Sequence, residues 1–276
     1  MAASVTIDWE FGFHIPQSAF RDSLTMNDDQ LFDYLLRLAD NCLILSQRLG
    51  EWCGRGPALE EDMALTNVAL DLNGQAQLWL GYAAEKEGKG RTEDQLAFLR
   101  DARDFRNLLL VEQANGDFAM TMARQFYFDL WHLLLLKELQ RSSDQRICAI
   151  SEKSLKEVQY HLRRSTGWVV RLGDGTEESH QRMGHAVTEL WQFTGELFET
   201  DAIDEAMVKE GIGPDLRTLQ IPWMDRVKSV FAEATLTLPS SGWMQRGGRR
   251  GIHTESLGYL LAEMQFLQRA YPNTQW

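Results

Sequence analysis

The stretch "LKEVQYHLRRS", residues 155–165, lies within a long helical pattern and carries two side chains that can bind a metal, Glu157 and His161. Residues four apart share one face of a helix, so the carboxylate and the imidazole can point in the same direction. Bundles that hold two iron atoms use Glu-x-x-His on each of two helices and a glutamate on each of the other two. Here three residues, rather than two, separate the pair. The stretch therefore predicts a helical bundle that either holds a metal or has lost one.

The distribution of prolines supports a helical fold around this stretch. Residues 58–213 contain no proline and are rich in Leu, Ala, Gln, Glu and Arg, which is typical of consecutive helices. Apolar residues before them step by three and four, as in Leu31, Leu35, Leu38, Cys42, Leu45 and Leu49. The pattern predicts helices over residues 28–51, 58–87, 118–139, 145–173, 177–198 and 254–271, and a short helix within 92–105. Because the turns are short, we expect an all-α fold, an antiparallel bundle with additional helices packed outside it.

Composition and charge exclude several function classes. The net charge is -12, so an extended nucleic-acid-binding face is not expected. No apolar run reaches the roughly 18 residues that a membrane helix needs, and the N-terminus has neither the basic start nor the apolar core of a signal peptide. The cysteines Cys42, Cys53 and Cys148 are scattered and odd in number, which is typical of reduced thiols. We therefore expect a cytoplasmic protein without nucleic-acid or membrane partners.

The other helices offer few further metal ligands. Asp71 is a candidate on the second helix, but Gly74 stands three residues later, where a histidine is needed. Asn41 lies on the inner seam of the first helix, where a glutamate is needed. The helix that follows "NGD" offers Gln125, and its Asp129 is interpreted as a surface or partner-facing residue. Glycine has no ligand atom, and amides are poor replacements for anionic ligands of iron.

The ligand count therefore falls short of a di-iron site. It gives two carboxylates, from Asp71 and Glu157, and one histidine, His161, with shifted spacing. The bundle pattern needs about six protein ligands. A buried or boundary polar pair is the simpler interpretation of Glu157 and His161, because such pairs are common at helical spacing.

Long segments of the chain resemble one protein family in order from residue 28 to 276. They are "LADNCLILSQRLGEWCG", "ALDLNGQAQLWLGYAAE", "NLLLVEQANGDFAMTMARQFYFDLWH", "ISEKSLKEVQYHLRRSTGWVVRLGDGTEES", "LWQFTGELFE" and "GGRRGIHTESLGYLLAEMQFLQRAYPNTQW". The family is that of the C subunits of bacterial phenylacetyl-CoA epoxidase. The resemblance implies a ferritin-like four-helix bundle with additional packed helices. In the catalytic relative the motif is Glu-Ala-Arg-His, so Tyr160 falls where the histidine would be and the site resembles a degenerate one.

The resemblance also implies a division of labour within a complex. A related catalytic A subunit would carry the di-iron site, activate dioxygen and epoxidise the aromatic ring of phenylacetyl-CoA. Electrons would come from NADPH through a separate reductase with FAD and an iron–sulfur cluster. This chain has no G-x-G-x-x-G motif and no cysteine cluster, so it is not that reductase. We expect no cofactor in this chain, and its partners to be the A subunit and further subunits of the complex.

Two further segments suggest contacts with partners. "QRGGRRGIHTE" places Arg246, Arg249, Arg250 and His253 around a glycine turn, which indicates either a site for an anion or acidic partner residues, or a solvated basic loop. "FYFDLWH", residues 126–132, is aromatic on more than one face, as in helices buried in a large bundle or against another subunit.

We interpret the second segment as a partner-facing surface. Phe126 and Phe128 are its candidate exposed aromatics.

The predicted domain organisation has two parts. Residues 1–26 form either a disordered extension from a misassigned start or an arm that adds to a partner. Within them, residues 5–15 alternate apolar and polar side chains at the strand period. Residues 27–276 form a single ferritin-like helical domain.

Three function classes stay open at this point. We favour a non-catalytic structural subunit of the epoxidase that supports the A subunit. The alternatives are a stand-alone di-iron oxygenase with atypical ligands and a helical protein that binds CoA esters.

Overall fold

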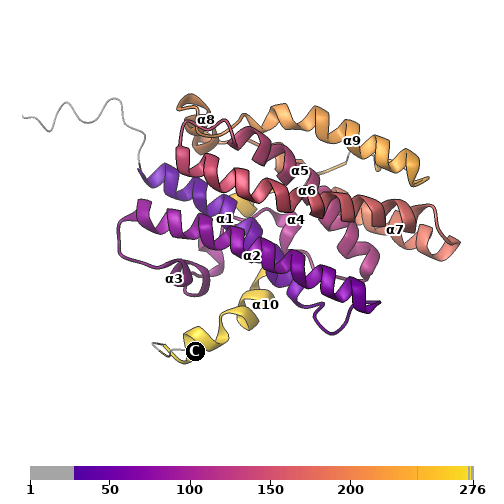
Figure 1. The fold of residues 1–276 in the computed structure, drawn as a ribbon, viewed down its shortest axis with the longest axis horizontal. Coiled ribbons are helices and arrows are strands. Elements are labelled where there is room, and N and C mark those ends of the chain that lie inside the picture. Colours follow the sequence, from indigo (N-terminus) through magenta and orange to yellow (C-terminus); the bar gives the residue numbers. More distant parts are fainter. Residues whose placement is uncertain (1–27, 241, 273, 275–276) are drawn as a thin grey trace, which may run out of the picture.

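Four long helices form the centre of the computed structural model, which describes residues 28–240, 242–272 and 274 (Figure 1). They are α1 (Asp28–Gly50), α2 (Leu59–Glu87), α5 (Phe118–Leu139) and α6 (Gln145–Gly173). Helix α1 packs along α2, and α5 packs along α6, while α2 and α6 join the two pairs. The described residues are helical with no strand, which confirms the all-α prediction. The extension predicted for residues 1–26 lies outside the described residues.

Side-chain caps explain where the later long helices begin. The Asp117 carboxylate accepts a hydrogen bond from the Met120 amide at 2.9 Å. Asp144 caps α6 in the same way, with its Oδ1 atom 2.9 Å from the Arg146 amide. Such caps satisfy amides that have no partner inside the helix. Their positions agree with the helix starts predicted after "NGD" and "SSD", and all four long helices fall within one residue of the predicted ranges.

Shorter helices surround this centre. They are α3 (Glu93–Phe98), α4 (Leu109–Glu112), α7 (Glu177–Trp191), α8 (Ala202–Lys209), α9 (Gln220–Glu233), α10 (Glu255–Met264) and α11 (Phe266–Ala270). The helix predicted over 177–198 ends earlier, at Trp191, and the one predicted over 254–271 breaks at Gln265. The sequence pattern does not predict α8 and α9. Pro222 lies in the first turn of α9, where a missing amide proton costs little.

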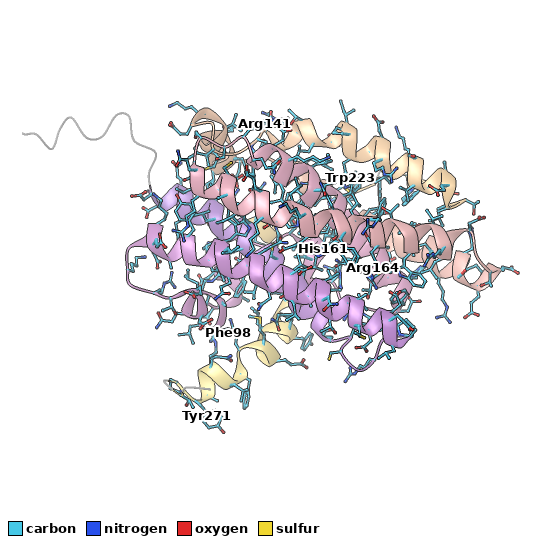
Figure 2. All side chains as sticks on the ribbon, viewed as in Figure 1. Phe98, Arg141, His161, Arg164, Trp223 and Tyr271 are labelled. Atoms are coloured by element: carbon cyan, nitrogen blue, oxygen red, sulfur yellow. The ribbon has the colours of Figure 1, made fainter. Side chains whose placement is uncertain are left out.

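The aromatic segment of α5 is covered by helices of the same chain. Trp223 on α9 donates its indole N–H to Tyr127 O at 3.1 Å, and the Tyr127 hydroxyl donates to Val187 O of α7 at 3.0 Å. Phe126 and Phe128 are both 0% exposed. The prediction that these two side chains form an exposed, partner-facing surface is therefore wrong, because both are buried within the chain and Phe126 packs against Phe231 of α9. Figure 2 shows Trp223 on the inner side of α9.

Candidate functional site

Helices α2 and α6 are joined in the middle of the molecule by two hydrogen bonds between side chains. His161 Nε2 lies 2.9 Å from Asp71 Oδ2, and Gln75 Nε2 donates to Glu157 Oε2 at 2.8 Å. A carboxylate accepts hydrogen bonds, so the imidazole proton belongs on Nε2. His161 is 1% exposed, and Figure 2 shows it where α6 crosses α2. Two side chains from each helix therefore pair with one another at the position where the bundle pattern would place a metal.

The polar positions of α2 that face α6, Asp71 and Gln75, recur after four residues rather than three. Gln75 lies inside, four residues after Asp71, which repeats the spacing of the glutamate and histidine on α6. Gly74 is exposed, and a Cβ atom added to it would meet nothing within 4 Å. Tyr160 is 41% exposed. Neither Gly74 nor Tyr160 occupies the interior position expected for a lost histidine ligand. The repeated four-residue spacing was the signal that could have identified Gln75.

Helix α1 contributes a thiol rather than the predicted amide. Asn41 is buried, but its Oδ1 accepts from the Leu108 amide at 2.8 Å and so faces a loop. The next residue, Cys42, points its Sγ at Gln75 Oε1 across 3.7 Å. Burial, and then the negative charge of Glu157, raise the pKa of the Cys42 thiol well above its usual value. The thiol therefore stays protonated and can donate.

Helix α5 adds a buried carboxylate, that of Asp129, which was predicted to be a surface or partner-facing residue. Asp129 is 1% exposed, so that interpretation is wrong: its side chain faces α6. Ser165 Oγ donates to Asp129 Oδ2 at 2.7 Å, and Gln125 Nε2 donates to Asp129 Oδ1 at 3.3 Å. Burial raises the pKa of Asp129 to about 6, although His161 and the hydrogen bond from Ser165 act in the opposite direction. The interior therefore holds a carboxyl group that titrates near neutral pH.

The same interior contains polar atoms without partners. His132 on α5 is buried, and burial, followed by repulsion from His161, lowers its pKa to about 3, so its imidazole is neutral. The Nδ1 atoms of both histidines and Gln125 Oε1 have no hydrogen-bond partner. Most buried polar atoms in proteins have one. The centre of the bundle is thus polar and incompletely satisfied.

This set of donors does not fit a di-iron centre. Among the described residues no group of three or more His, Cys, Asp or Glu side chains converges as a metal site would require. Two interior positions are filled by the amides of Gln75 and Gln125, which are weak ligands for iron. The carboxylates of Asp71 and Glu157 each bind a neighbouring side chain instead of a shared point. What the arrangement can do chemically is hold helices together and store a proton.

Two of the basic residues predicted to bind an anion are matched by carboxylates of the same chain. Arg249 pairs with the buried Asp204 and donates to Glu199 O at 2.6 Å. Arg246 lies 2.9 Å from the Glu199 carboxylate. These contacts tie the glycine turn to α8 and to the segment before it.

His253 is also matched, whereas Arg250 is not. His253 Nδ1 lies 2.7 Å from Glu112 Oε2. Burial alone would lower the pKa of His253, but the hydrogen bond and the charge of Glu112 raise it above its usual value. Arg250 is exposed and has no side-chain partner among the described residues. The anion site stays a prediction, and Arg250 is the one of its four residues whose side chain has no partner among the described residues.

No helix in the described part of the chain is long and apolar enough to cross a membrane.

Comparisons with known proteins support the resemblance seen in the sequence. A family profile described as "Phenylacetic acid catabolic protein" matches residues 17–276. The chain is 55% identical over 248 residues to a protein of Escherichia coli (strain K12) that is named as the C subunit of 1,2-phenylacetyl-CoA epoxidase. That match covers 90% of this chain and 100% of the relative. The predicted resemblance to the C subunits of this epoxidase is confirmed.

Proposed function

Because the chain belongs to the phenylacetic acid catabolic protein family, we propose that it is a non-catalytic structural subunit of a phenylacetyl-CoA epoxidase complex. Its fold in this proposal is ferritin-like, a four-helix bundle of α1, α2, α5 and α6 with the shorter helices packed outside. The partner it supports is the related catalytic subunit, which would hold the di-iron centre. That subunit would epoxidise the ring of the CoA ester with electrons delivered from NADPH by a separate FAD and iron–sulfur reductase.

The observation that carries the proposal is the crossed set of hydrogen bonds between α2 and α6. Asp71 binds His161 and Gln75 binds Glu157, so the positions that would face a metal face each other. An amide at position 75 and the orientation of each carboxylate toward a neighbour favour helix packing over metal binding. The chain thereby keeps the long helices of the bundle without the ligands of a redox centre.

A purified pair of proteins tests this function. The chain alone and the chain co-expressed with the catalytic subunit are each loaded with Fe(II) under anaerobic conditions, desalted and assayed for iron. We expect less than about 0.1 iron per chain when this chain is purified alone. The pair should co-migrate in size exclusion at micromolar concentration, with iron assigned to the catalytic subunit. Stoichiometric iron in the chain alone, or two proteins that migrate separately while the catalytic one is fully active by itself, would overturn the proposal.

A further inference from the structure

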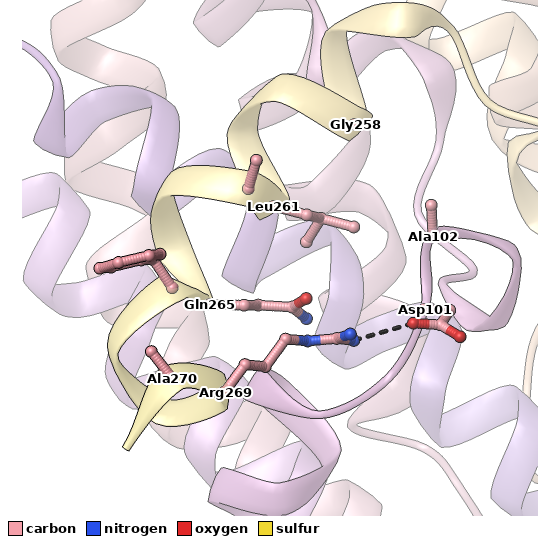
Figure 3. Close-up of a pocket in the computed structure, with 9 residues that line it drawn as sticks. Asp101, Ala102, Gly258, Leu261, Gln265, Arg269 and Ala270 are labelled. Carbon is pink, nitrogen blue, oxygen red and sulfur yellow. Dashed lines mark hydrogen bonds and ion pairs between the residues drawn. The ribbon is translucent and has the colours of Figure 1, made fainter. Parts of the chain in front are cut away.

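An open groove runs between the C-terminal helices and the turn at residues 101–103 (Figure 3). One part, about 510 Å³, is lined by Asp101 and Ala102 on one side and by α10 and α11 on the other. A second part, about 600 Å³, lies toward the start of α10 and is lined by Arg103, Arg250 and Ile252. The two parts share Ala102 and Gly258, so they form one continuous groove. In Figure 1 α10 extends away from the central bundle, which leaves this side of the helix open.

Small residues explain why the groove is hollow. Gly258, Ala262 and Ala270 stand on the groove side of α10 and α11, opposite Ala102. A Cβ atom added to Gly258 would meet nothing within 4 Å. Hydrogen bonds from Gln265 to the backbone of Ala97 and Arg100 hold the two helices at this distance from the turn.

That anchor fixes the shape of the groove. Gln265 Nε2 donates to Ala97 O at 3.2 Å and to Arg100 O at 3.0 Å. Arg269 donates to Arg100 O at 2.8 Å and to the Asp101 carboxylate at 3.0 Å, which is the contact drawn across the groove in Figure 3. A groove held by buried hydrogen bonds is formed in advance, so a ligand does not have to order it.

Two large apolar side chains line the groove and are open to solvent. Ile252 and Phe266 are each 61% exposed. Single exposed apolar residues are ordinary, whereas two that line the same groove favour an interaction site. Aromatic residues in particular are enriched where proteins bind one another.

Two guanidinium groups at one end give the groove a charge preference. Arg103 and Arg250 are exposed, and neither has a side-chain partner among the described residues. The neighbouring Arg249 and Arg269 are both paired with carboxylates. Glu255 is the one acidic residue that lines this part of the groove. In a chain of net charge -12, a local surplus of unpaired arginine is complementary to carboxylates from outside.

We propose that this groove is the docking site for an acidic segment of another subunit of the same complex. An apolar side chain of that segment fills the space between Phe266 and Ala102. Its flanking carboxylates bind Arg103 and Arg250, where a guanidinium can hold a carboxylate with two hydrogen bonds. This inference rests on the proposed function, because it takes the partner to be a subunit of the epoxidase.

Binding measurements with matched variants test the groove. Fluorescently labelled chain is titrated with the other purified epoxidase subunits, each alone and all together. Gly258→Leu fills the groove, and the pair R103E and R250E reverses its charge. Gly184→Leu on α7, where an added Cβ also meets nothing within 4 Å, is the control for the first change. The pair R226E and K228E on the exposed side of α9 is the control for the second.

We expect both groove variants to raise the Kd for at least one subunit tenfold or more, while both controls bind like the unchanged chain. Circular dichroism melting of each isolated variant establishes that the fold is kept. Equal Kd values for groove and control variants would overturn the docking site. So would a groove change that alters only self-association, or only binding of phenylacetyl-CoA, with the subunits still assembled. If the unchanged chain binds no subunit, the proposed function itself fails.

Discussion

Asp71 and His161 lie 90 positions apart in the chain and meet at 2.9 Å, between Asp71 Oδ2 and His161 Nε2. The two side chains differ in exposure, since that of the aspartate is 36% exposed and that of the histidine is 1% exposed. The hydrogen bond therefore connects the bundle interior to its surface. It also fixes the proton of the imidazole on Nε2, which leaves the Nδ1 atom as an acceptor without a donor.

The first prediction concerns this hydrogen bond. Asp71→Ala leaves the buried N–H of His161 without its acceptor and should lower the free energy of unfolding by about 1 kcal/mol, because water can reach this half-open position. Asp71→Asn keeps a side-chain oxygen as acceptor and should cost less. Urea unfolding at pH 7 measures both. Equal losses for the two variants would mean that the charge of Asp71, rather than its hydrogen bond, stabilises the protein.

The second prediction concerns the buried carboxyl of Asp129. Its pKa rises from 3.8 to about 6 on folding, so the folded state binds more protons than the unfolded state between these values. The contribution of Asp129 to stability is present below pH 4 and is lost as pH rises to 6, a change of up to about 3 kcal/mol. In Asp129→Asn this loss disappears, so the variant should gain stability relative to the unchanged chain between pH 4 and 6. Urea unfolding across that range measures the difference.

The third prediction concerns His132, whose pKa is lowered on folding, so its contribution to stability changes with pH in the opposite direction. The pKa of His132 falls from 6.5 to about 3 on folding, so the unfolded state binds more protons in this window. Its contribution to stability is present above pH 6.5 and is lost as the pH falls. His132→Gln should therefore lose stability relative to the unchanged chain as the pH rises from 4 to 6.5. A parallel pH dependence of the two variants, Asp129→Asn and His132→Gln, would show that the burial of these groups has been misjudged.

The fourth prediction separates the buried aromatics from the exposed ones. Phe126→Ala should lower the free energy of unfolding by about 3–5 kcal/mol, because it opens a cavity beneath α9, where Phe126 packs against Phe231. Tyr259→Ala, at a side chain that is 72% exposed, should change it by less than about 0.5 kcal/mol. Thermal and urea unfolding of the isolated chain compare the two. A small effect of Phe126→Ala would contradict the close packing of this side chain in the core.

The long helices could be predicted from the sequence because local signals decide them. A proline-free tract, apolar residues at helical spacing, and caps such as Asp117 and Asp144 act within a few residues of one another. Helices α8 and α9 are shorter, and Pro222 stands in the first turn of α9. Helix α8 packs against α1, and α9 packs against α5 and α6, so the stability of both helices comes from tertiary contacts that no local pattern reveals. Without α9, the aromatic residues of α5 could be interpreted as exposed.

The interior positions were harder to predict because rotation about a helix axis separates neighbours by about 100°. The three-residue spacing of the Glu-x-x-His motif predicted that Gly74 and Tyr160 lie inside. The structure instead places Gln75 and His161 there. The tertiary packing of α2 on α6 selects the four-residue spacing. Asp129 was missed for a related reason: a charged residue is buried when Ser165 on another helix supplies a hydrogen bond, and the partner cannot be seen from α5 alone.

The central claim, that this chain supports catalysis without performing it, is tested most directly by turnover of the assembled complex. The double variant Asp71→Asn and Glu157→Gln removes the two carboxylates that join α2 to α6, while it keeps an oxygen acceptor toward His161 and Gln75. Phenylacetyl-CoA epoxidation is measured per assembled, iron-loaded complex, with size exclusion and iron content as controls. The account predicts turnover within a factor of about two of the unchanged complex, since no reacting group is lost. A fall of a hundredfold or more, with assembly and iron content unchanged, would contradict it and place these carboxylates in the chemistry.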